Sequence, residues 1–152
     1  MRSILPAAIA ALLILAACEE APPPTPHGSY ALDVEAMLAV MDERLSTPAE
    51  PLTETQTEMA RDFKSKLLGM FKGLTATLEV RTDKTFQIPV LRDGVVGNTY
   101  SGTWSLAGDQ ILLQGEATVG EGMNTTGTLH ADGIHCPNGF ADIKVPVVFR
   151  RK

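Results

Sequence analysis

Alternation of apolar and polar residues, interrupted by short polar turns, dominates the chain from residue 75 onward. It recurs over residues 75–88, 100–113 and 127–149. Because successive side chains of a strand point to opposite faces, each run predicts strands with one buried face. Asp132-Gly133, between two apolar runs, is typical of a two-residue hairpin turn. Successive hairpins with no helix between them predict an antiparallel meander of about six or seven strands.

Upstream of the meander, apolar residues recur every three or four positions, which indicates two amphipathic helices. We expect the first over about residues 33–46, with Asp33 as its N-cap. The second should cover about residues 53–72, because Thr53 and Gln56 have the spacing of a capping box. The short turn between them predicts a two-helix hairpin. Packed on the meander, this hairpin gives an α+β fold in which the helices cover the apolar face of the sheet.

The chain begins with the layout of a secretory signal, in which Arg2 precedes an apolar stretch that ends in small residues. This stretch is too short to cross a hydrocarbon core of about 30 Å as a helix. We therefore assign residues 1–17 to a signal peptide, 18–29 to a tether and 30–152 to a single domain. The tether is rich in proline, so at about 3.1 Å per residue it should hold the domain roughly 30 Å from its attachment point.

The end of the apolar stretch, Leu15-Ala16-Ala17-Cys18, resembles the lipobox of bacterial lipoprotein signal peptides. The resemblance implies export, attachment of diacylglycerol to Cys18, cleavage before this cysteine and acylation of the new amino terminus. Since each buried methylene contributes about 0.8 kcal/mol, two or three acyl chains form a stable membrane anchor. Glu19 follows Cys18. In the family, retention at the inner membrane favours aspartate at this position. We therefore expect a lipid-anchored protein of the cell envelope, on the periplasmic face of the outer membrane if the cell is Gram-negative.

The body of the chain also resembles a family. Its motifs are the hexapeptide 28–33 before the first helix, the strand 102–106 with its Gly-x-Trp pattern, and the Gly-Asp turn at 108–109. Together they are similar to small, largely uncharacterised bacterial lipoproteins with a lipocalin-like β-meander. The resemblance implies a lipocalin-like barrel or a half-barrel. It implies no catalytic residues.

Charge and motif content exclude several function classes. The formal net charge is −5, and nucleic-acid binding depends on neutralising phosphates, so we expect no nucleic-acid partner. The sequence has no nucleophile elbow and no Gly-rich loop that opens a helix. We therefore expect no enzymatic activity and no cofactor.

One cluster of metal-ligating residue types stands out. His130 and His135 flank the Asp132-Gly133 turn, and Cys136 follows directly; such side chains bind zinc or copper(I). Neighbours on a strand point to opposite faces, however, so at most two of the three ligands share a side. The competing interpretation places Cys136 in the core and both histidines in solvent. We keep the three as weak candidates and predict no metal.

Two function classes remain. Val95 and Val96 lie in a long connection before Asn98 and are hard to place in a core, so we predict a partner surface there. The favoured hypothesis is an envelope accessory that docks another envelope protein. The alternative is a lipocalin-like binding module, in which the meander encloses a pocket for a lipid or another small hydrophobic ligand.

Overall fold

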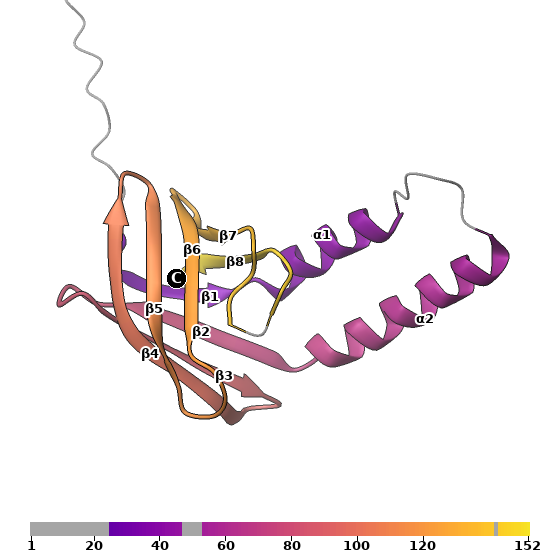
Figure 1. The fold of residues 1–152 in the computed structure, drawn as a ribbon, viewed down its shortest axis with the longest axis horizontal. Coiled ribbons are helices and arrows are strands. Elements are labelled where there is room, and N and C mark those ends of the chain that lie inside the picture. The colour runs from indigo at the N-terminus through magenta and orange to yellow at the C-terminus, as the bar shows by residue number, and fades with distance from the viewer. Residues whose placement is uncertain (1–24, 47–52, 142) are drawn as a thin grey trace, which may run out of the picture.

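The computed structural model describes residues 25–46, 53–141 and 143–152. Within these ranges, strands and helices follow one another with every strand paired antiparallel to the next, and β8 pairs back to β1 to close a barrel (Figure 1). The elements in chain order are β1 (Gly28–Leu32), α1 (Val34–Ser46), α2 (Glu54–Phe71), β2 (Leu74–Val80), β3 (Thr85–Arg92), β4 (Val95–Ala107), β5 (Gln110–Ala117), β6 (Met123–His130), β7 (Gly133–Cys136) and β8 (Val147–Arg151).

Closure of the barrel corrects two predictions. The described residues form eight strands rather than six or seven, and the half-barrel is wrong. The additional strand is β1, which begins two residues before the predicted domain boundary at residue 30 and joins β2 to β8. Because the sheet closes on itself, its apolar face lies inside the barrel. The helices therefore do not cover the face of an open sheet, although α1 adds Met37 and Met41 to the core.

Both helices start where local capping predicts. The Asp33 carboxylate accepts a hydrogen bond from the Ala36 amide at 2.8 Å. Thr53 and Gln56 form the predicted capping box, with each side chain bonded to the backbone of the other residue. The observed bounds of α1 and α2 differ from the predicted ones by one residue, so local interactions decide these boundaries.

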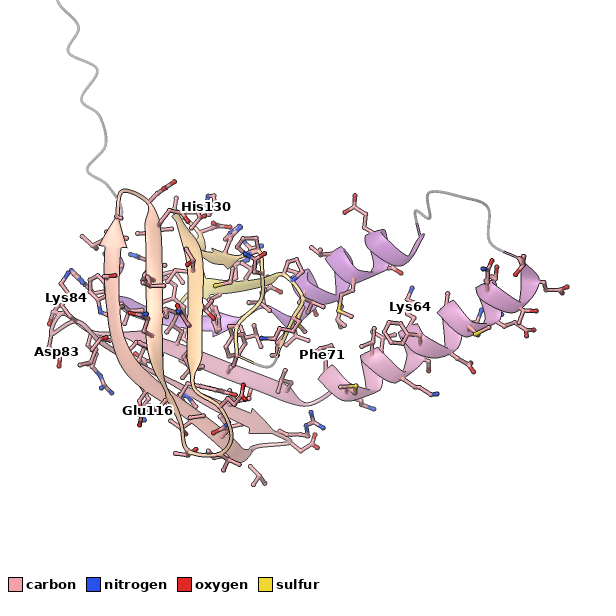
Figure 2. The ribbon with its side chains drawn as sticks, viewed as in Figure 1. Lys64, Phe71, Asp83, Lys84, Glu116 and His130 are labelled. Carbon is pink, nitrogen blue, oxygen red and sulfur yellow. The ribbon has the colours of Figure 1, made fainter. Side chains whose placement is uncertain are left out.

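The helical hairpin projects from one end of the barrel (Figure 1). Met37 and Met41 of α1 are buried in the core cluster, whereas no residue of α2 is buried. An ion pair between Lys64 of α2 and Asp42 of α1 joins the two helices (Figure 2). At its carboxyl end, α2 returns to the barrel, where Phe71 packs against the core.

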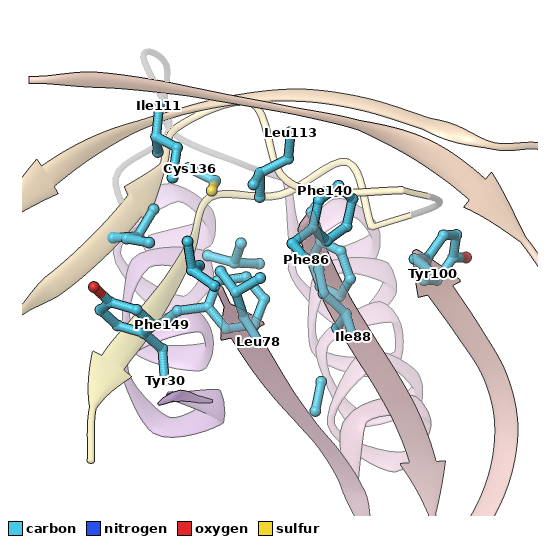
Figure 3. Close-up of a cluster of buried hydrophobic side chains, with 14 of the residues drawn as sticks. Tyr30, Leu78, Phe86, Ile88, Tyr100, Ile111, Leu113, Cys136, Phe140 and Phe149 are labelled. Atoms are coloured by element: carbon cyan, nitrogen blue, oxygen red, sulfur yellow. The ribbon is translucent and has the colours of Figure 1, made fainter. Parts of the chain in front are cut away.

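The barrel interior holds one continuous apolar core (Figure 3). Inward residues alternate with outward ones in strands such as β2 and β6, as the sequence pattern predicts. The largest fully buried side chains are those of Tyr30, Phe86, Phe140, Phe149, Met37, Leu78, Ile88, Ile111, Leu113, Ile134, Val147 and Cys136.

The segment that contains Val95 and Val96 is not the long connection that we predicted. β3 extends to Arg92 and β4 begins at Val95, so a two-residue turn joins them. The register shifts after Val90, and Gly97 stands unpaired in β4 as a bulge. The alternation is broken at this bulge, which is why the sequence reads locally as a loop.

Candidate functional site

The barrel has one end that side chains cover, which we call the closed end. It carries the β2–β3, β4–β5 and β6–β7 turns. The indole Nε1 of Trp104 donates to the Arg81 carbonyl at 2.8 Å, and Lys84 Nζ lies 3.9 Å from the ring centroid. The ring of His27 lies 6.1 Å away. Trp104 is only 4 % exposed, so its indole covers the core at this end.

The chain enters the barrel at this same end. The Tyr30 hydroxyl donates to the Pro26 carbonyl at 2.7 Å and accepts from Arg151 Nη2 at 2.9 Å. From Tyr30, β1 runs toward the opposite end, where α1 begins. Figure 2 shows this polarity, because Lys84 lies at one end of the β2–β3 hairpin and Phe71 at the other.

The opposite end, which we call the open end, holds a pocket of about 370 Å³. This volume falls within the range of about 300–1,000 Å³ typical of small-molecule sites. Five segments contribute to its wall: the end of α2, the start of β2, the end of β3, the bulged part of β4 and the loop before β8. The lining residues are Met70, Phe71, Leu74, Val90, Arg92, Gly97, Asn98, Tyr100, Phe140, Ala141 and Ile143.

The pocket wall includes the top of the packed core. Phe140 lies edge-on to Tyr100, with centroids 6.2 Å apart, and edge-on to Phe149 at 5.2 Å. The backbone groups of Phe140 and Ile143 exchange hydrogen bonds of 3.0 and 2.9 Å, which fixes the loop that carries both side chains. Aromatic pairs of this geometry are favourable. This wall is therefore apolar and preformed.

Two small residues, Gly97 and Ala141, line the pocket beside this apolar wall. Gly97 lies at the β4 bulge, where an added Cβ atom would meet only the Val90 carbonyl oxygen, at 3.9 Å. Ala141, on the opposite loop, extends no further than its methyl group. Because Gly97 lines the pocket and has room beside it, we expect a larger side chain there to reduce the pocket volume.

Besides the Tyr100 hydroxyl, two polar side chains line the pocket, those of Asn98 and Arg92. The Asn98 side chain is fully used within the fold, because it donates to the Val119 carbonyl at 2.9 Å and accepts from Thr118 Oγ1 at 2.8 Å. Arg92 is exposed, and its guanidinium forms no hydrogen bond or ion pair within the described part of the chain. Arg92 is therefore able to bind an external group.

The structure separates the three weak metal candidates. The rings of His130 and His135 lie 4.2 Å apart on the outer face of the β6–β7 hairpin, and His135 Nε2 is 3.2 Å from Asp132 Oδ1. Cys136 points into the core and is fully buried. No three metal-ligating side chains converge within residues 25–46, 53–141 and 143–152.

Burial also determines the chemistry of Cys136. It raises the pKa of the thiol to about 12, so the thiolate that acts as a nucleophile is absent near neutral pH. Cys136 forms no disulfide with any residue that the structure describes.

Val95 and Val96 lie at the open end, next to the pocket. Their side chains are 70 % and 58 % exposed. Val95 is the register partner of Arg92, and Val96 precedes Gly97. Both valines are thus free to contact a partner or a ligand at the pocket entrance.

Sequence analysis offered a pocket enclosed by the meander as an alternative but did not locate it, because the walls come from segments far apart in the chain. The one local signal was the difficulty of placing Val95 and Val96 in a core. The signal peptide, the lipobox and Cys18 lie outside the described residues.

Comparison of the chain with protein-family models, curated proteins and solved structures gave no significant match. Neither helix in the described ranges combines the length and apolar character needed to cross a membrane.

Proposed function

We propose that this protein is a lipid-anchored binding module of the bacterial cell envelope that holds the apolar part of a small ligand at the open end of its barrel. The observation that carries the proposal is the preformed apolar pocket beside Phe140 and Tyr100. The closed antiparallel barrel fits the lipocalin-like binding alternative, and it moves our preference from the accessory hypothesis to this one.

Several features support binding without catalysis. Among the described lining residues, the pocket has no carboxylate, histidine or thiol. Arg92 and Tyr100 are its ionisable groups, and neither is an ordinary general base at neutral pH. Hydrophobic walls with a few polar groups are typical of ligand pockets. We propose a non-enzymatic role, with no cofactor and no nucleic-acid partner.

The anchor is part of the proposal. We propose lipidation of Cys18 and attachment to the periplasmic face of the outer membrane if the cell is Gram-negative. The path of the chain supports a functional orientation, because Pro26 contacts Tyr30 at the closed end. A tether that attaches there leaves the open end free to point away from the anchoring membrane, toward soluble ligands or partners.

A second candidate function is the envelope accessory that docks another protein. The observation in its favour is a group of exposed apolar side chains at the open end and on the hairpin. Besides Val95 and Val96, it includes Met59, Phe63 and Met70 of α2, which are 54–61 % exposed. The two functions are compatible, since a partner could deliver or receive the ligand at the pocket.

Photolabelling tests the binding proposal. The acylated protein, reconstituted in phosphatidylcholine nanodiscs, is irradiated with a twelve-carbon alcohol that carries a diazirine at its apolar end. We expect the label on pocket residues such as Val90, Phe140 and Ile143, identified by peptide mass spectrometry. Gly97→Leu should reduce this labelling to background, because the leucine fills the pocket.

Gly69→Leu is the matched control. It makes the same chemical change on α2, where an added Cβ atom has no neighbour within 4 Å. Labelling should be the same as in the wild type. Label that is spread over the outer surface, or that is unaffected by Gly97→Leu, would overturn the proposed function.

A further inference from the structure

We infer that the ligand is a single-chain amphiphile with an anionic head group, and that Arg92 binds this head group at the pocket entrance. The inference rests on the proposed function, because it names the class of ligand that the same pocket takes. It is carried by the position of one uncompensated guanidinium on an otherwise largely apolar wall.

The backbone holds Arg92 at the entrance from both sides. It is the last residue of β3, where it is the register partner of Leu74 in β2 and of Val95 in β4. The Asp93 amide donates to the Gly73 carbonyl at 2.9 Å, which ties the β3–β4 turn to the chain that leaves α2. The base of the Arg92 side chain is therefore fixed relative to the apolar wall.

Among the described residues, Asp93, the acidic neighbour of Arg92 in the chain, does not pair with the guanidinium. The Asp93 carboxylate lies against Gly73, so closely that a Cβ atom there would be 2.0 Å from its Oδ1. No ion pair joins Asp93 to Arg92 in the described part of the chain. Arg92 therefore keeps its charge and its donors for a ligand.

Lys144, close in the chain to the lining residues Ala141 and Ile143, is already occupied. Lys144 Nζ donates to the Ala141 carbonyl at 2.8 Å and so supports the loop that forms the opposite wall. Arginine is also the better choice for a planar or tetrahedral oxyanion, because its fork donates two parallel hydrogen bonds. The protein as a whole is acidic, with a formal net charge of −5. Attraction of an anion is thus a local property of this entrance.

The size of the pocket argues for one chain. Its volume of about 370 Å³ is near the lower limit of about 300 Å³ for small-molecule sites. One acyl chain or a small ring system suits such a space, whereas a two-chain phospholipid needs more. A fatty acid or a lysophospholipid presents one chain and one oxyanion, which matches the pocket and Arg92.

The experiment compares two diazirine probes of equal length, dodecanoic acid and dodecanol, in the same nanodiscs. For each protein variant, the ratio of acid to alcohol labelling in the pocket is measured. Taking this ratio between variants cancels the different partition of the two probes into the bilayer. In Arg92→Gln we expect the ratio to fall by about fivefold, the size of a partly solvated ion pair.

Arg61→Gln on the exposed surface of α2 serves as the matched control and should leave the ratio unchanged. An equal ratio in the wild type and in Arg92→Gln would overturn the inference, while pocket labelling by dodecanol would still support the proposed function. If neither probe labels the pocket of the wild type, the proposed function itself would instead be overturned.

Inorganic phosphate distinguishes an amphiphile site from a simple anion site. At millimolar concentration it should not protect the pocket from the dodecanoic acid probe, because the apolar chain supplies most of the binding. Full protection by inorganic phosphate would overturn the inference and assign the entrance to a free anion.

Discussion

The two ends of the barrel are built from the same strands, yet one is covered and the other holds a pocket. At the closed end, Trp104 lies under Lys84 and His27 and is almost fully buried. At the open end, the pocket lining includes the small residues Gly97 and Ala141. The two ends thus differ in the size of the side chains that line them, a bulky indole at one and small residues at the other.

The loops that connect the strands also differ between the two ends. The closed end has short turns, such as the two-residue turn at Asp132. The open end carries the helical hairpin between β1 and β2, together with the loop between β7 and β8. Binding residues in proteins commonly lie on such longer connections, supported by a rigid scaffold. We therefore expect functional residues, and changes in sequence, to be tolerated best at the open end.

The strongest test of this comparison is a matched pair of truncations. Trp104→Ala should lower the free energy of unfolding by about 3–5 kcal/mol, because it leaves a cavity in a packed layer. Val90→Ala at the pocket should cost only about 1 kcal/mol, since one side of Val90 already faces open space. Urea denaturation followed by circular dichroism measures both, as Trp104 is the single tryptophan. Equal losses would mean that the pocket is as tightly packed as the closed end.

Cys136 reports whether the pocket reaches the core. The thiol should react with iodoacetamide far more slowly in the native protein than in urea, because it is buried and its pKa is raised to about 12. The unfolded thiol loses its proton near pH 9, so stability should fall between pH 9 and 12. That fall should be smaller in Cys136→Ala. Rapid native labelling at pH 8 would instead show a path from the pocket into the barrel.

Asp33 joins the open end to α1, and its loss should have a moderate effect. Asp33→Ala removes the helix cap and should cost about 1 kcal/mol, whereas Asp33→Asn keeps a capping oxygen and should cost less. The Ala36 amide and the Arg150 guanidinium lower the pKa of Asp33 from its usual value of 3.8.

The sign of the Asp33 shift gives the pH dependence. The stabilisation is complete above the unfolded pKa of 3.8, and it is lost as the pH falls through the lower folded value. The wild type should therefore lose more stability than Asp33→Asn on acidification below pH 4. Parallel acid-denaturation curves for the two proteins would contradict this assignment.

Val95 and Val96 should give the smallest effect. Both are exposed, so Val95→Glu and Val96→Glu should change the free energy of unfolding by less than about 0.5 kcal/mol. A loss of several degrees in Tm would mean that these valines pack in the fold. An unchanged Tm together with weaker recovery of a cross-linked envelope protein would favour the accessory function at this surface.

The sequence predicted those parts of the fold that depend on neighbouring residues. Asp33 and Thr53 begin the helices as expected, and the alternation through Leu78, Ile111 and Leu113 gives the inward faces. β1 was missed because it is short and both of its partner strands lie far along the chain. The position and lining of the pocket could not be predicted, since Phe71, Arg92 and Phe140 become neighbours only after the barrel closes.

What the sequence by itself determined is therefore local: the capped helices, the order of hairpins and the burial of Cys136 with its neighbouring inward residues. Tertiary structure alone decided that β8 meets β1, that the helical hairpin projects from one end, and that an apolar pocket beside Arg92 remains unfilled. The physical reason is the distance along the chain over which each interaction acts. Caps and alternation act over a few residues, whereas closure and residual volume depend on how all the strands pack together.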